Sequence, residues 1–207
     1  MNRLRARVLS ASLAVLSLSS FAAVMAIPSV AHAEDGAIDA FKAKHEAVVE
    51  LVKKKAADDV LQAAMDGLLD YDYLAEAALG GPQNYKEVCQ TRCAEFEELL
   101  TKLIRENYLR MVRKAESHPV EYVGQTPGKN GIYKVTTRVK INKNGRDQTV
   151  TVDYVMHQID GQWQVRDIIT DDISLANTYR YEFNKIYKAQ GIDGIISKLE
   201  DKLAKLD

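Results

Sequence analysis

Apolar side chains recur with a helical period in the first half of this chain and alternate with polar ones in the second half. Ile38, Phe41, Val48 and Val52 form one stripe at helical spacing, and the lysines of residues 53–55 follow it. Positive charge is favourable at a helix C-terminus because it offsets the helix dipole. The pattern therefore predicts a first helix that ends near residue 55.

Three more helices are predicted before residue 116. Asp58 or Asp59 is expected to cap the second, because a short carboxylate can accept hydrogen bonds from free backbone N–H groups. In the stretch LLDYDYLAEAALGG, Asp72 is the expected cap of the third, which should end at the glycines of residues 80–81. A long helix is expected from about Tyr85 to Lys114. Its buried side would carry Phe96, Leu99, Leu100, Leu103 and Met111.

After His118-Pro119 the period changes to strict alternation, which is typical of strands with one solvated face. Asn144-Gly145 and Asp160-Gly161 are hairpin signals, since both residue pairs accept the backbone of a two-residue turn. The pattern predicts an antiparallel meander of about four strands. They would lie at residues 120–123, 133–141, 149–157 and 163–165.

Two helices are predicted after the meander. Ser174 is the expected cap of the first, Gly191 should end it, and Asp193 should open the second. The fold class is α+β, with N-terminal helices, an antiparallel meander and C-terminal helices that pack over the apolar face of the sheet.

The N-terminus has the layout of a secretory signal peptide. Residues 1–33 combine a basic start, a long uncharged apolar run and an Ala-His-Ala site before Glu34 and Asp35. An uncleaved membrane anchor is the alternative, but Pro28 and the small residues favour cleavage after Ala33. We therefore expect a free bacterial periplasmic protein that consists of one domain over residues 34–207.

Net charge narrows the choice of partners. Removal of residues 1–33 takes away three arginines and no acid, and leaves 25 basic and 29 acidic side chains. Such a mildly acidic balance argues against nucleic acid as a partner.

Motifs for metal or nucleotide chemistry are missing from the sequence. His45, His118 and His157 are far apart and lack neighbouring ligands, so no metal site and no cofactor are expected. Cys89 and Cys93 stand four residues apart rather than in a C-x-x-C redox motif. An oxidising compartment permits a disulfide between them, although a regular helical turn presents the two side chains poorly. A bridge would fit if the long helix begins only after Cys89, and two packed thiols are the alternative.

Carboxylates beside aromatic residues raise the possibility of acid–base catalysis. Asp153 next to Tyr154, and Asp167 after Trp163, are the candidates. On a regular strand, however, Asp153 and Tyr154 point to opposite faces, so they cannot share one site. We therefore expect no catalytic residues and no enzyme activity. A small-molecule isomerase or dehydratase with a cone-shaped pocket of sheet and helices is the alternative.

One long stretch carries a family resemblance. The run WQVRDIITDDISLANTYRYEFNKIYKAQGIDGIISKLEDKL at residues 163–203 closely resembles the C-terminal signature of the MlaC family, periplasmic phospholipid-binding proteins also called toluene-tolerance auxiliary proteins. Upstream, LLDYDYLAEAALG at residues 68–80 and the segment from Phe96 to Tyr108 are similar to the family's middle region. The resemblance covers about residues 37–203.

The resemblance implies a carrier that takes its phospholipid cargo between two membranes. Its partners would be an inner-membrane MCE-domain ABC transporter complex and an outer-membrane lipoprotein/porin complex, in the service of outer-membrane lipid asymmetry. The acyl tails would be buried between sheet and helices, in an apolar pocket that selects little among headgroups. A periplasmic chaperone for lipoproteins is a further alternative.

The same resemblance indicates which residues would hold the lipid, although ordinary core packing would use the same apolar stripe. Arg180 lies between two tyrosines; it would steady the lipid phosphate or, as we favour, form an internal ion pair. The expected lipid-binding residues are Val135, Val139, Val152, Tyr154, Trp163, Val165, Ile173, Leu175, Tyr179, Arg180 and Phe183.

Two positions depart from the family pattern. Asp172 stands where the family usually has a glycine before its Val/Ile-Ser pair, so a different backbone is expected at that turn. The segment GGPQNY replaces the family's aromatic residue after Leu-Gly, directly before the two cysteines. Both changes would affect the mouth of the pocket or a docking surface rather than the apolar interior.

Overall fold

The structure is a computed structural model that describes residues 36–115, 119–143 and 145–206. The expected signal peptide of residues 1–33 lies outside this range, and the single domain over residues 34–207 stays a prediction. The helices are α1 (Ala37–Lys53), α2 (Asp58–Asp66), α3 (Tyr71–Ala78), α4 (Pro82–Cys89), the 3₁₀ turn η2 (Gln90–Arg92), α5 (Cys93–Ala115) and α6 (Leu175–Leu203). The strands are β1 (Val120–Pro127), β2 (Tyr133–Lys143), β3 (Arg146–Ile159), β4 (Gln162–Thr170) and β5 (Ile173–Ser174).

The predicted meander is present, with five strands instead of about four. The strands pair antiparallel in the order β1-β2-β3-β4-β5, and the fold class is α+β as expected. β1 runs longer than predicted because a bulge between Tyr122 and Gly124 restores its pairing with β2. The outer edge of β4 is covered by β5 and by Leu69, which forms a parallel bridge to Val165. Covering this edge protects it from pairing with another chain.

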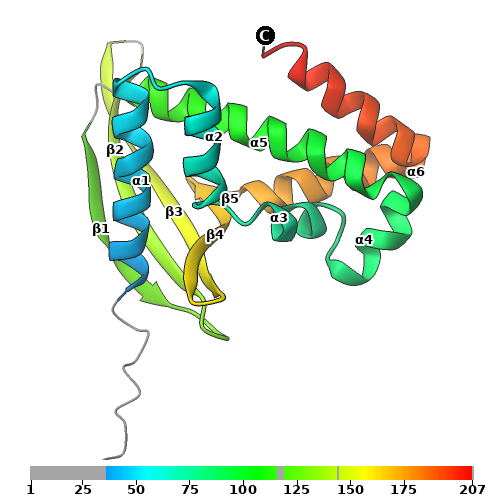
Figure 1. The fold of residues 1–207 in the computed structure, drawn as a ribbon, viewed down its shortest axis with the longest axis horizontal. Coiled ribbons are helices and arrows are strands. Elements are labelled where there is room, and N and C mark those ends of the chain that lie inside the picture. Colours follow the sequence, from blue (N-terminus) through cyan, green and yellow to red (C-terminus); the bar gives the residue numbers. More distant parts are fainter. Residues whose placement is uncertain (1–35, 116–118, 144, 207) are drawn as a thin grey trace, which may run out of the picture. The chain divides into compact units, whose positions relative to one another are not determined.

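Helices pack against one face of the sheet. α1 lies over the strands (Figure 1) and contacts β1, β2, β4 and α5. Phe41 on α1 is fully buried, and its ring lies 4.1 Å from that of Tyr154 on β3. α3, α4, α5 and α6 contact one another in a second group beside the sheet (Figure 1). None of the helices that the structure describes is both long and apolar enough to span a membrane.

Two of the expected helix caps are wrong. Ala57 precedes α2, so Asp58 and Asp59 lie in its first turn, where their charges still suit the helix dipole. Asp70, not Asp72, caps α3 by accepting a hydrogen bond from the backbone N–H of Tyr73 at 3.1 Å. Leu69 pairs with Val165, so the chain enters the helix only after Asp70.

The expected long helix over residues 85–114 is broken in two. Gln90 has a φ of 52°, which an α-helix cannot accommodate, and η2 separates α4 from α5 there. Cys89 and Cys93 form a disulfide across this break. Arg92 pairs with Glu95 and with Asp193 on α6, so the break is also tied to the C-terminal helix.

Reduction of this disulfide is expected to lower the free energy of unfolding by about 2 kcal/mol. The bridge closes a loop of only a few residues, for which the chain-entropy relation gives a value of that size. Urea unfolding with and without a thiol reductant measures the difference. A Cys93→Ser variant should show no further response to the reductant, and equal midpoints for the reduced and oxidised wild type would contradict the expectation.

Ser174 caps α6 as predicted, and Gly191 interrupts that helix. The Ser174 hydroxyl accepts a hydrogen bond from the backbone N–H of Asn177 at 3.1 Å. Gly191 has a φ of 64° and a ψ of −161°, so α6 consists of two helical halves joined by a kink. Only glycine adopts this backbone conformation at little cost.

Asp172 has a left-handed backbone. Asp171 and Asp172 form the two-residue turn from β4 to β5, with φ angles of 46° and 66°. Hairpin turns of this kind favour Asn-Gly because both central residues need positive φ. The aspartate therefore occupies a backbone conformation that suits glycine.

Asp172→Val is expected to lower the free energy of unfolding by about 1–2 kcal/mol, since a β-branched residue is strained at positive φ. Asp172→Gly should stay within about 0.5 kcal/mol of the wild type, because relief of strain offsets the greater freedom of glycine in the unfolded chain. Urea denaturation of the two variants makes the comparison. Equal stability of both would show that the turn does not depend on this backbone angle.

Candidate functional site

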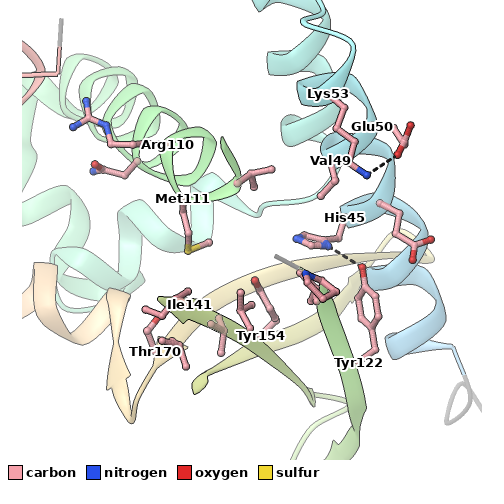
Figure 2. Close-up of a pocket in the computed structure, with 18 residues that line it drawn as sticks. His45, Val49, Glu50, Lys53, Arg110, Met111, Tyr122, Ile141, Tyr154 and Thr170 are labelled. Carbon is pink, nitrogen blue, oxygen red and sulfur yellow. Dashed lines mark hydrogen bonds and ion pairs between the residues drawn. The ribbon is translucent and has the colours of Figure 1, made fainter. Parts of the chain in front are cut away.

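A cavity of about 850 Å³ lies between α1, α5 and the sheet (Figure 2). His45 and Val49 reach it from α1, and Met111 from α5. Tyr122 on β1 and Val152 on β3 belong to its sheet side. The complete lining is His45, Glu46, Val49, Glu50, Lys53, Asn107, Arg110, Met111, Val112, Pro119, Val120, Tyr122, Val139, Ile141, Val150, Val152, Tyr154 and Thr170.

The floor of the cavity follows from the alternation along β2 and β3. Val139 and Ile141 on β2, and Val150, Val152 and Tyr154 on β3, all face the helices. Val139 pairs directly with Val150, so the apolar side chains of both strands form one continuous surface. Lys140 on β2 and Thr149 on β3, the neighbours of Val139 and Val150, are polar and exposed on the opposite face. The cavity is therefore apolar on its sheet side.

One polar pair interrupts the apolar wall. His45 Nδ1 lies 2.8 Å from the Tyr122 hydroxyl, and the two residues are 77 positions apart in the sequence (Figure 2). Burial lowers the pKa of His45 from 6.5 to about 4, because its imidazolium form would lose hydration. Burial also raises the pKa of Tyr122 to about 12, with a further contribution from the nearby charge of Glu46. Both groups are therefore neutral near pH 7.

Charged side chains gather only at the rim. Glu46, Glu50 and Lys53 lie on one side of α1, at helical spacing, and all three are exposed. Asn107 and Arg110 lie on α5 across the opening and are also exposed. The arrangement combines an apolar interior with a polar edge, as in sites that bury the apolar part of an amphipathic ligand.

Three of the expected lipid-binding residues line the cavity. Val139, Val152 and Tyr154 belong to its floor. Five others are buried in the core and do not line it: Val135, Trp163, Val165, Tyr179 and Phe183. Alternation along the strands correctly indicates which face is apolar, but the cavity covers only part of that face.

The remaining three expected residues lie elsewhere. Ile173 is 67% exposed on β5, Leu175 is half-buried at the start of α6, and Arg180 is exposed. Among the described residues, no ion pair includes Arg180, and it does not line the cavity. Lipid contact by these residues stays a prediction.

Sequence reasoning missed the helical wall of the cavity. Val49 and Met111 line it, as does His45, which is only 5% exposed. Val49 and His45 extend the apolar stripe of α1 to one side, and a wide stripe is a signal that a helix faces more than one partner. Helical periodicity does not show which part of that stripe lines a cavity and which part packs in the core.

The two carboxylates considered for catalysis are placed away from the cavity. Asp153 accepts a hydrogen bond from Thr136 at 2.6 Å and pairs with Lys134 at 2.9 Å, on the far face of the sheet. Asp167 accepts from the Ser174 hydroxyl and from the backbone N–H of Ala176, at the N-terminus of α6. Both carboxylates therefore hold secondary structure together. Across the described ranges, no three His, Cys, Asp or Glu side chains are placed to hold a metal ion.

Comparison with known proteins gives a family match and a structural likeness. The sequence model of the family described as MlaC protein matches residues 37–201. The solved structure of a phospholipid-binding protein from Ralstonia solanacearum, in complex with a phospholipid, has a TM-score of 0.63 and 20% sequence identity. The alignment covers 82% of this chain and 98% of that chain. This likeness shows that the two proteins share a fold.

A second solved structure, a variant of a protein named Rd1NTF2_05, reaches a TM-score of only 0.29 and supports no argument. It is 18% identical over 34% of this chain and 60% of that chain. Among curated proteins, no significant sequence match is found.

Proposed function

The chain belongs to the MlaC family, and on that premise we propose that it is a phospholipid carrier whose cavity holds the acyl chains of one lipid. The observation that carries the proposal is the cavity between α1, α5 and the sheet, which is apolar inside and charged only at its rim. The headgroup would lie at the rim, among exposed side chains and water. Transport then requires no covalent chemistry from the protein.

The size of the cavity supports this proposal. Liquid water occupies about 30 Å³ per molecule, and a methylene group is of similar size, so about 850 Å³ has space for roughly 28 such groups. That number is comparable to the methylene content of two long acyl chains. Each methylene group contributes about 0.8 kcal/mol when it leaves water, so even partial filling would bind a lipid firmly.

The structural relative supports the same reading. The Ralstonia solanacearum protein is described as phospholipid-binding and was solved with a phospholipid bound. Almost its whole length aligns with this chain, so the two proteins share an overall fold. By analogy, the cavity of this chain would serve the same ligand class.

We further propose that the carrier works in the periplasm. The signal-peptide pattern of residues 1–33 and the family membership support this location. The lipid would pass between an outer-membrane lipoprotein/porin complex and an inner-membrane MCE-domain ABC transporter complex, which would maintain outer-membrane lipid asymmetry. Lipid transfer from the loaded protein to vesicles should then be faster when the vesicles contain such a transporter complex.

The test of lipid binding is extraction of the protein purified from periplasm without detergent, followed by mass spectrometry. About one phospholipid per chain is the expected result. Protein that carries no lipid and also refuses added phospholipid would overturn the proposal. A substrate screen for an isomerase or dehydratase would then follow, although the carboxylates that line the cavity, Glu46 and Glu50, are exposed rather than buried.

A further inference from the structure

The rim of the cavity has charge of opposite sign on its two sides. Arg110 stands on α5, while Glu50 and Lys53 stand on α1 across the opening (Figure 2). Glu46 lies one turn before Glu50 on the same side of α1. The net charge of the rim residues differs between the two helices, because Lys53 on α1 is already paired with Glu50.

The α1 side is negative. The Lys53 ammonium lies 3.2 Å from the Glu50 carboxylate, so these two charges offset each other. Glu46 remains as an exposed carboxylate, and no ion pair among the described residues includes it. Its charge reaches the cavity wall, since it contributes to the raised pKa of Tyr122.

The α5 side is positive. Arg110 Nη2 donates a hydrogen bond to the backbone carbonyl oxygen of Leu206 at 3.1 Å, and this holds the guanidinium at the rim. No ion pair in the described part of the chain includes Arg110. The remaining N–H groups of a guanidinium match the oxygens of a phosphate. Asn107, one turn earlier on α5, offers an amide beside it.

We propose that this rim selects zwitterionic amino headgroups, with the lipid phosphate toward Arg110 and the ammonium toward Glu46. The inference rests on the proposed function, because a headgroup reaches the rim only when acyl chains occupy the cavity. A headgroup that carries ethanolamine or choline presents both charges in this order. An anionic glycerol headgroup offers the same phosphate to Arg110 but no cation to Glu46.

The expected preference is moderate. Exposed charge pairs contribute little each, so ethanolamine or choline lipids should exceed the glycerol lipid by roughly threefold to tenfold. Salt screens exposed charges over about 8 Å at physiological ionic strength, so the preference should shrink as salt is raised.

The experiment loads delipidated protein from vesicles of phosphatidylethanolamine, phosphatidylcholine and phosphatidylglycerol in equal amounts and with identical acyl chains. Extraction then gives two readouts. One is the total lipid per chain, and the other is the ratio of each zwitterionic lipid to phosphatidylglycerol. Glu46→Gln, which leaves the Lys53–Glu50 pair in place, should bring the ratio close to one without lowering the total. Glu46→Lys should invert the ratio in favour of the glycerol headgroup. Arg110→Gln should weaken retention of all three lipids by roughly twofold to fivefold during dilution, since all carry phosphate.

Matched controls lie on the same two helices. Asp39 is exposed on α1 and Arg113 is exposed on α5, and neither lines the cavity. Asp39→Asn and Arg113→Gln should therefore leave both the total lipid per chain and the headgroup ratio unchanged.

Two outcomes would overturn the inference while the proposed function stands. One is an even headgroup ratio in the wild type at about one lipid per chain. The other is an Arg110→Gln variant that retains lipid like the wild type. Absence of lipid from every protein, including the wild type, would instead overturn the proposed function and this inference together.

Discussion

Val139→Trp combined with Val152→Trp is expected to abolish phospholipid binding by filling the cavity from its floor. Both valines line the cavity on adjacent strands, and the larger rings would occupy space meant for acyl chains. Displacing about six methylene groups costs about 5 kcal/mol of binding free energy, or more than a thousandfold in Kd. Binding of a fluorescent phospholipid measures the loss.

The control places the same two rings on the opposite face of the sheet. Lys140 follows Val139 and Thr151 precedes Val152 on the same two strands, and neither lines the cavity. Lys140→Trp with Thr151→Trp should bind lipid like the wild type. Circular dichroism and urea unfolding show whether each double variant folds. If the cavity-filling variant is folded and still binds lipid with wild-type affinity, the acyl chains lie elsewhere.

His45 is expected to make the protein lose about 3 kcal/mol of stability between pH 6.5 and pH 4. Burial lowers its pKa from 6.5 to about 4, so in this window the unfolded chain binds a proton that the folded protein does not. Protonation therefore favours the unfolded state as the pH falls from 6.5 to about 4, and above about pH 6.5 the contribution of His45 no longer changes with pH. A shift of this size corresponds to about 3 kcal/mol.

His45→Gln should remove this part of the pH dependence, because an amide does not titrate. Urea unfolding of the variant and of the wild type at several pH values isolates the effect, since the other titrating groups are common to both. Tyr122→Phe is the companion variant: it removes the hydroxyl that contacts His45 but leaves the imidazole buried. The slope with pH should persist in that variant. If the free energy of unfolding changes with pH in the same way for the wild type and for His45→Gln, then His45 is hydrated in the folded protein.

The elements of the fold could be predicted wherever a local pattern decides them. The alternation at residues 133–141 and the hairpin signal Asp160-Gly161 predicted strands, and Ser174 predicted a cap, because such effects act within a few residues. The break between α4 and α5 could not be decided from the sequence, where a helix start after Cys89 was only an alternative, because the apolar period continues through it. The disulfide and the contact of Arg92 with Asp193, which is far away in the sequence, accompany that break.

The cavity could be predicted only in part. Val139, Val152 and Tyr154 were found because alternation shows which face of a strand is apolar. Val135 and Val165 have the same character and the same face, yet they are fully buried in the core. The sequence pattern of an apolar strand position is the same whether another side chain or a cavity lies above it.

The sequence by itself determined the α+β class, the apolar face of the meander and the family, because periodicity, caps and motifs are local properties of the chain. Only the tertiary structure decided where the cavity opens, that His45 meets Tyr122 across its wall, and that Arg110 faces Glu50 across its rim. These relations depend on how far α1 and α5 stand from the sheet and from each other. That spacing results from the packing of segments widely separated in the chain, and no local pattern records it.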